Sequence, residues 1–337
     1  MIKSKYISTS SSRGITLTEV MMAVVILGII TPGLVMLMST MTRGFTGYEA
    51  SVNLREVNQK TLNKIYLRVG SNKRLFENSA NDTGYLNKIS LTGCPARLTG
   101  SILPTIQDAG TLTTGTTNFV SASVGNSLLF ANNDSSMQVL TGTNTVRIDL
   151  FRFNYYYVTS DNPKPIYDHA CYRLIEWRSV QYADYNQLMN ITNTTRRANA
   201  IKALYNANIR YAWDSDNLSA ASAFSLFTLA TGAVTVSAAH VIPQYKCTVL
   251  TSIVTGLILG GYGYGVSANS AGWATAPKTV PVFAAASGLF PGGFEVAIVG
   301  SSSGRQILLR CVLVAQGSMR GIVADDMQII ATARDLW

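Results

Sequence analysis

Charged residues and histidine are scarce in this sequence, which limits the chemistry it can perform. Only 13% of the 337 residues are charged, and the two histidines are His169 and His240. The nucleophile pattern G-x-S-x-G occurs at 300–304, but in α/β hydrolases the base histidine follows the serine, and here both histidines precede it. We therefore predict no catalytic residues and no enzyme activity, and we treat a membrane-anchored periplasmic enzyme as the least favoured class.

Metal-ligand patterns are also missing. His169-Ala170-Cys171 and the acidic run at 214–217 are the nearest approaches, but neither has the spacing of a zinc or EF-hand site. Calcium at 214–217 or at Asp325-Asp326 stays open beside the simpler interpretation of a polar loop. We expect no cofactor and no structural metal.

Cysteine is rare, and all four cysteines follow the long apolar segment described below. They allow three pairings, among which the sequence does not choose, and free buried thiols are a further alternative. The candidates for disulfide formation are Cys94, Cys171, Cys247 and Cys311.

One long uncharged run dominates the N-terminal part. The 23 residues from Val20 to Thr42 carry no charge, and Arg43 ends the run. As a helix they would extend about 35 Å, enough to cross a hydrocarbon core of about 30 Å. Lys3, Lys5 and Arg13 precede the run, so we expect the N-terminus in the cytoplasm and the chain after Arg43 on the other side.

An acidic residue, Glu19, stands where this apolar run begins. A carboxylate at the edge of an apolar helix is costly unless something pairs with it. The positions three and four residues later are Met22 and Ala23, so the helix itself offers no cation there. We expect the partner of Glu19 to come from elsewhere.

This arrangement resembles the class III signal of type IV prepilins. The shared features are a basic leader ending in Gly14, an apolar residue at Ile15, Glu19 five residues beyond the glycine, and the apolar run. An ordinary secretory signal has a shorter apolar core with its cleavage site after the core, and a plain membrane anchor does not explain Glu19. Most members of the family have Phe where Ile15 stands here.

The resemblance implies a specific maturation and role. Prepilin peptidase would remove residues 1–14, Ile15 would be N-methylated, Glu19 would pair with the terminal amine of a neighbouring subunit, and Pro32 would kink the helix. It implies a minor pilin or pseudopilin of a type IV pilus or type II secretion pseudopilus. The implied partners are other pilin subunits, the inner-membrane assembly platform and, before assembly, membrane lipid.

The same resemblance implies a location in the inner membrane, followed by a periplasmic or extracellular filament at the bacterial cell surface. The net charge of +9, reduced to +6 without the leader, leaves open a binding role toward DNA or another surface ligand. A filament-borne adhesin or DNA-uptake receptor is therefore the alternative function.

The expected fold is α+β and pilin-like. A leader (1–14) precedes a membrane or filament-core half of a helix (15–42) and an amphipathic half (43–70), on which a mainly antiparallel β domain (71–337) packs. In the amphipathic half, one apolar face is predicted from Leu54, Val57, Thr61, Ile65 and Val69, with Arg55, Asn58, Lys60 and Lys64 facing away.

Within the globular part we expect short strands and loops over 75–144 and a central strand over 145–158 paired with 171–182. The alternating pattern changes phase at Leu150-Phe151, which predicts a bulge there. The aromatic row of this strand could stack a ligand, but packing against a helix is the favoured interpretation. A helix over 193–208, a hairpin around 300–304 and a final strand or helix over 326–332 complete the prediction. The apolar stretch 248–266 is glycine-rich, so we predict strands there rather than a second membrane span.

Overall fold

The computed structural model describes residues 15–98, 101–112, 124–141, 144–166, 169–230, 233–254, 293–316 and 322–334, with backbone alone for 160, 162–166, 169–171, 252–254, 316 and 322. The leader, including Gly14, and most of the stretch 248–266 lie outside these residues. The helices are α1 (Leu17–Val69), α2 (Ala80–Lys88), α3 (Tyr185–Met189) and α4 (Thr194–Asn206). The strands are β1 (Asn72–Phe76), β2 (Ile106–Gln107), β3 (Leu128–Thr141), β4 (Asn144–Ile166), β5 (His169–Ser179), β6 (Tyr182–Asp184), β7 (Tyr211–Trp213), β8 (Phe224–Ala230), β9 (Ala233–Ala238), β10 (Gln244–Val254), β11 (Phe294–Val299), β12 (Arg305–Gln316) and β13 (Ile322–Ala333).

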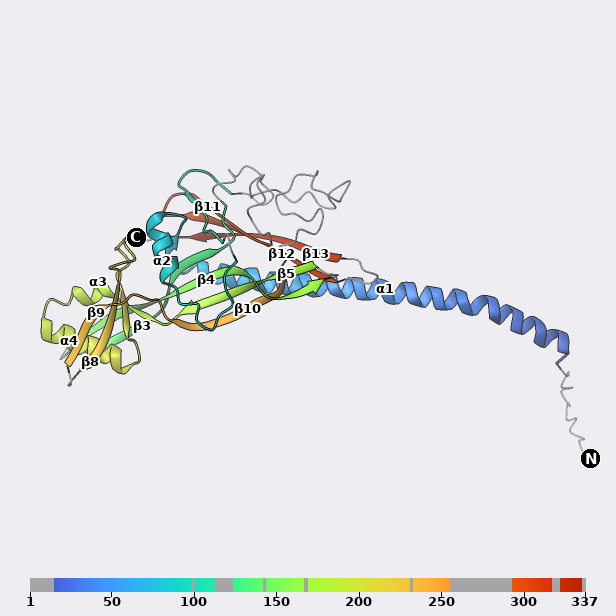
Figure 1. Cartoon of the computed structure of the whole chain (residues 1–337), viewed down its shortest axis with the longest axis horizontal. Coiled ribbons are helices and arrows are strands. Elements are labelled where there is room, and N and C mark those ends of the chain that lie inside the picture. The colour runs from blue at the N-terminus through green and yellow to red at the C-terminus, as the bar shows by residue number, and fades with distance from the viewer. Residues whose placement is uncertain are drawn as a thin grey trace, which may run out of the picture.

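A single helix of 53 residues, α1, projects from a β-rich domain (Figure 1). At 1.5 Å per residue it is about 80 Å long. It runs unbroken through Pro32 and ends at Gly70, whose N–H bonds to the Tyr66 carbonyl at 3.0 Å. The chain is therefore α+β, with a mainly antiparallel sheet, as the sequence indicates.

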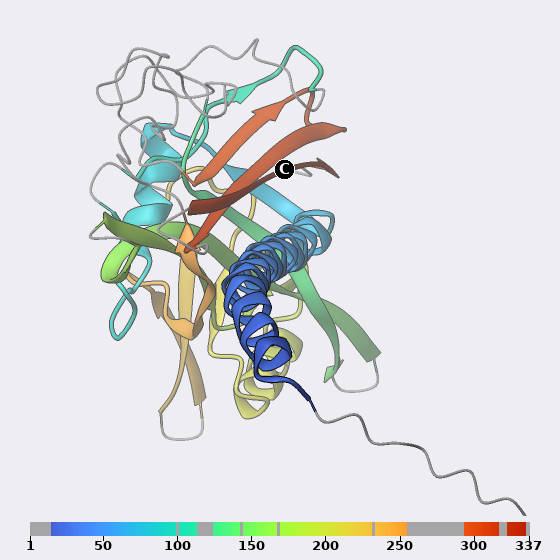
Figure 2. The ribbon, with the colours of Figure 1, turned by 90° about the vertical axis from the view of Figure 1, so that its right-hand side faces the viewer.

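The C-terminal half of α1 lies across β12, β13 and β10 on one face of the sheet (Figure 2). Leu62, Ile65 and Val69 are buried there, which confirms an apolar face in this half of the helix. The prediction was wrong for Asn58 and Lys64, which were expected to face away: Asn58 is fully buried and Lys64 bonds to Glu176 of the sheet. It was also wrong for Val57, which is 42% exposed. The Asn58 side-chain Nδ2 donates to the Cys311 carbonyl at 2.9 Å and to Asp325 Oδ2 at 2.7 Å, which ties this turn of the helix to β12 and β13.

The thirteen strands of the described residues form one sheet. Ten of them follow the order β2-β11-β12-β10-β5-β4-β6-β7-β8-β9, while β13 pairs with β12, β3 pairs with β4, and β1 pairs with β3. The pairs β4–β5 and β11–β12 are antiparallel, as predicted. Gly300 begins the β11–β12 turn at φ +98°, where a side chain would be strained. The last segment, β13, is a strand and pairs with β12.

The predicted bulge is present, but in the neighbouring strand. Leu150 and Phe151 of β4 face Ser135 and Asn133 of β3, so Asp134 is the extra residue. The phase change in β4 has a different cause: the apolar residues before and after this point pack against different elements on opposite faces of the strand. Leu150 packs in a cluster with α4, whereas Phe151 packs on the opposite face with Trp213.

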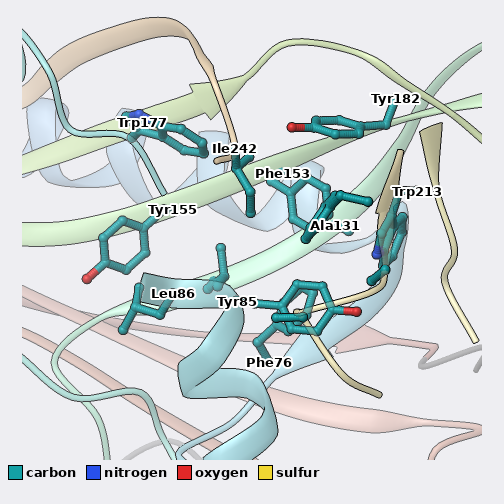
Figure 3. Close-up of a cluster of buried hydrophobic side chains, with 14 of the residues drawn as sticks. Phe76, Tyr85, Leu86, Ala131, Phe153, Tyr155, Trp177, Tyr182, Trp213 and Ile242 are labelled. Carbon is teal, nitrogen blue, oxygen red and sulfur yellow. The ribbon is translucent and has the colours of Figure 1, made fainter. Parts of the chain in front are cut away.

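Alternate residues of the central strands enter two separate cores. Tyr156 and Val158 join the core under α1, while Tyr155 and Tyr157 join the core on the other face. In that second core, Phe153 lies 4.9 Å from Trp213 between ring centroids, and α2 contributes Tyr85 (Figure 3). The aromatic row is buried, so it packs the sheet against a helix rather than presenting rings to a ligand.

Residues 75–144 contain more regular structure than expected. The prediction of short strands and loops missed α2 and the 14-residue strand β3. The helix is capped by Ser79, whose hydroxyl accepts from the Asp82 N–H at 3.2 Å. The middle of the strand, residues 132–136, consists of Asn, Asp and Ser, and these residues usually favour turns. Its antiparallel pairing with β4, which continues on both sides of Asp134, overrides that preference.

A buried ion cluster joins β11, β12 and β13. Arg310 donates to Glu295 Oε2 at 2.8 Å and to both carboxylate oxygens of Asp326 at 3.0 and 2.9 Å. Burial raises the pKa of Glu295 to about 7, although the Arg310 charge opposes the shift and Asp326 adds to it. The side chain of Glu295 is 2% exposed.

The cluster makes stability dependent on pH. Between about pH 4.5 and 7 the folded protein keeps a proton on Glu295 that the unfolded chain releases, so the free energy of unfolding falls as pH rises through this window. We expect a loss of about 2 kcal/mol between pH 5 and 7.5 in wild-type protein relative to Glu295→Gln, which has no such proton. Chemical denaturation of the full chain in detergent, followed by Trp fluorescence, measures the difference. Parallel pH profiles of the two proteins would contradict this assignment.

Candidate functional site

The N-terminal half of α1 makes no contact that buries it in the domain. From Ile15 to Met38 every side chain is exposed, including bulky ones such as Met36 at 75% exposure. This half is long and apolar enough to cross a membrane, and among the described residues α1 is the one helix that meets this criterion. An apolar surface of this size requires a cover of lipid or protein.

The first turn of α1 is closed by a capping box. The Thr16 hydroxyl accepts from the Glu19 N–H at 3.4 Å, and Glu19 Oε2 accepts from the Thr16 N–H at 2.9 Å. The Thr16 hydroxyl also donates to Glu19 Oε2 at 3.1 Å. Glu19 therefore has hydrogen-bond partners at the start of its own helix, while the cationic partner expected from elsewhere stays a prediction.

These hydrogen bonds do not neutralise the charge of Glu19. Thr16 is neutral, and the ion pairs that α1 makes through Lys60, Lys64 and Arg68 lie in its C-terminal half. A negative charge at a helix N-terminus is favoured by the helix dipole in water, but in an apolar surrounding it still lacks a counter-charge. The site is thus a preformed, oriented carboxylate at the end of an apolar rod. Ile15, directly before the cap, is 77% exposed.

Sequence reasoning missed Thr16. The signal was present, because Thr16-Leu17-Thr18-Glu19 matches the capping-box pattern T-x-x-E before an apolar run. The box fixes where the helix starts and aims the carboxylate back toward the N-terminus.

The other end of α1 is attached by charge as well as by packing. Glu176 of β5 is buried, and it accepts from Lys64 Nζ at 2.7 Å and from the Tyr156 hydroxyl at 2.9 Å, while Arg68 forms an ion pair with it. Burial raises the pKa of Tyr156 to about 12, although the nearby arginines oppose the shift. We call Glu176, Lys64, Arg68 and Tyr156 the α1 clamp. It holds the amphipathic half of the helix on the sheet.

The cysteines divide between the two cores. Cys94 and Cys247 pack against the aromatic core, whereas Cys311 is buried in the core under α1, and all three are free thiols. Cys171 is described by its backbone alone. The prediction of at least one disulfide therefore remains untested. The fold brings Cys94 and Cys247 to the edge of the same aromatic core.

The motifs at 300–304 and 214–217, weighed as catalytic and metal-binding, lie in two polar loops. Residues 300–304 form a hairpin turn, in which Ser301 and Ser303 bond to one another. Asp214 and Asp216 both accept from the Asn186 amide, at 3.0 and 2.9 Å, so the polar-loop interpretation describes their contacts. No group of three metal-binding side chains occurs among the described residues.

Comparisons with protein-family models, curated proteins and solved structures find no match to this chain. The functional argument therefore depends on the geometry of α1 and on the sequence around its N-terminus.

Proposed function

We propose that the protein is a structural subunit, of the minor pilin or pseudopilin kind, of a type IV pilus or type II secretion pseudopilus. The observation that carries the proposal is the two-part character of α1. Its apolar half projects uncovered from the domain, while its amphipathic half is fixed to the sheet by the α1 clamp and by Asn58. A subunit that moves from lipid into a helical bundle needs this division.

Before assembly, the apolar half of α1 lies in the inner membrane with the leader in the cytoplasm. Prepilin peptidase removes residues 1–14 and leaves a charged amine on Ile15. In the filament, the apolar half exchanges lipid contacts for contacts with helices of other subunits, and the domain is carried outward. The assembly platform drives this transfer.

The capping box sharpens the role of Glu19 in this proposal. Because Thr16 already supplies hydrogen bonds, the need that remains is a positive charge. The terminal amine of a neighbouring subunit provides that charge inside an apolar core, where attraction between opposite charges is strong. The carboxylate is oriented before the neighbour arrives, so little ordering cost remains at assembly.

The direct test is the mature N-terminus. We expect purified protein to begin at Ile15, with a methylated amine, in the mass spectrum of its N-terminal peptide. Gly14→Leu should leave all of the protein at its full length, because the added side chain fills the position that the peptidase requires to be small.

Ser12→Leu is the matched control, since it adds the same side chain two residues earlier and should be processed normally. Mature-sized Gly14→Leu protein on a gel, or wild-type protein that still begins at Met1, would overturn the proposed maturation.

A further inference from the structure

Two thiols from distant parts of the sequence meet at the edge of the aromatic core. Cys94 ends a turn in which its N–H bonds to the Leu91 carbonyl at 2.9 Å, and its Sγ donates to Gln244 Oε1 at 2.8 Å. Gln244 begins β10, the strand that also carries Cys247. The segment with Cys94 therefore lies over the start of β10.

Two further hydrogen bonds hold the Cys94 segment in this place. The Tyr157 hydroxyl donates to the Pro95 carbonyl at 2.7 Å, and Trp177 Nε1 donates to the Ser90 carbonyl at 2.9 Å. Trp177 is the residue of β5 that faces Cys247 of β10 in the antiparallel register. Cys94 thus sits between two anchored residues, directly above the strand pair that presents Cys247.

The electrostatics of these groups agree with this placement. Burial raises the pKa of the Cys94 thiol to about 12, and a hydrogen bond with Cys247 adds to the shift. The pKa of Tyr157 is raised by burial and then by Cys247 and Cys94.

We propose that Cys94 and Cys247 are disulfide partners. The two S–H bonds break and one S–S bond forms, and the two electrons and two protons pass to the disulfide of a thiol oxidant, which is reduced to two thiols. In the cell, this step depends on the proposed function, because only export of the domain brings it to an oxidising compartment. The bond fixes the 89–98 segment to β10 across the edge of the core.

The other cysteines do not compete for this pairing. Cys311 belongs to the core on the opposite face of the sheet. The backbone of Cys171 faces Lys164 near the β4–β5 turn, six residues along β5 from Trp177, which places it about 20 Å from Cys247. A disulfide needs Cα atoms within about 7 Å.

Peptide mapping tests the pairing in two arms. In the first, cells are lysed in N-ethylmaleimide and the full chain is purified in detergent without reductant. In the second, the reduced full chain is equilibrated with oxidised and reduced glutathione. Digestion with trypsin should give peptide 89–97 linked to peptide 247–278 in both arms, and the link should persist in Cys171→Ser and Cys311→Ser. The oxidised protein should melt about 5 °C or more above the reduced protein.

The second arm decides the pairing. Alkylated Cys94 and Cys247 there, or either one linked to Cys171, would overturn it. A link in the second arm with free thiols in the first would support the pairing and count against the exported location, so that the proposed function would fail while the partners stand.

Discussion

Glu19→Gln protein is expected to be inserted and processed normally but to lose at least tenfold of its incorporation into sheared filaments. The substitution removes the charge and keeps the shape. The amide oxygen of glutamine still accepts from the Thr16 N–H, since a capping box accepts glutamine at this position. Any loss of assembly then reports the missing charge rather than a frayed helix.

Thr16→Val is the matched control for the opposite change. It removes the hydroxyl that caps the helix and leaves the Glu19 carboxylate charged. If Glu19 acts by pairing with a neighbour's amine, Thr16→Val should assemble at close to the wild-type level, with slight fraying of the first turn. If Glu19 acts only as a cap, Thr16→Val should be the more damaging change and Glu19→Gln nearly silent.

The measurement is the ratio of sheared-filament to membrane protein on an immunoblot, with processing checked by the mature mass. Wild-type incorporation of processed Glu19→Gln would remove the basis for the charge-pairing step. It would be the result expected of a plain membrane anchor, or of an anchored enzyme.

The long helix was predictable because its signal is local. An uncharged run from Val20 to Thr42, an amphipathic pattern after it and Gly70 at its end specify α1 without knowledge of the rest of the fold. The β4–β5 pair and the hairpin at 300–304 were predictable for the same reason, since alternation and turn residues lie within one short stretch.

What could not be predicted depends on contacts between distant segments. The sequence pattern predicts that Asn58 faces solvent. It is buried because β12 supplies a carbonyl and β13 a carboxylate that accept from its amide. The phase change in β4 suggests a bulge in that strand, because the sequence does not show that the α4 cluster covers Leu150 and Trp213 packs on Phe151 of the opposite face. Similarly, β3 forms from polar residues because β4 pairs with it along its length.

In the candidate site, too, the residues with a local sequence signal were predictable and those that depend on distant contacts were not. Glu19 was found from its position in an apolar context, and Thr16 could have been found from the capping-box pattern. The α1 clamp could not have been found from the sequence, because Glu176 follows Lys64 by 112 positions and no local pattern marks it as the partner of Lys64 and Arg68. The meeting of Cys94 and Cys247 likewise depends on the path of the 89–98 segment.

The α1 clamp is the second place where one carboxylate has a large effect. Glu176 is 2% exposed, and the cations that it pairs with both come from one face of α1. Removal of Glu176 leaves Lys64, Arg68 and the Tyr156 hydroxyl without this partner. Breaking a buried ion pair from one side usually costs 3–5 kcal/mol, because the remaining charge loses its compensation. Lys64 still reaches water, so the lower end of that range applies.

We therefore expect Glu176→Ala to lower the free energy of unfolding by about 3 kcal/mol, measured by chemical denaturation of the full chain in detergent. Glu56→Ala is the matched control. Glu56 pairs with Lys60 at 2.5 Å on the same helix, but both side chains are exposed, so its loss should change stability little. The variant Glu176→Ala should also release α1 from the sheet, which limited proteolysis between α1 and β1 would detect. Equal stability of the two variants would show that apolar packing of Leu62, Ile65 and Val69 alone holds the helix in place.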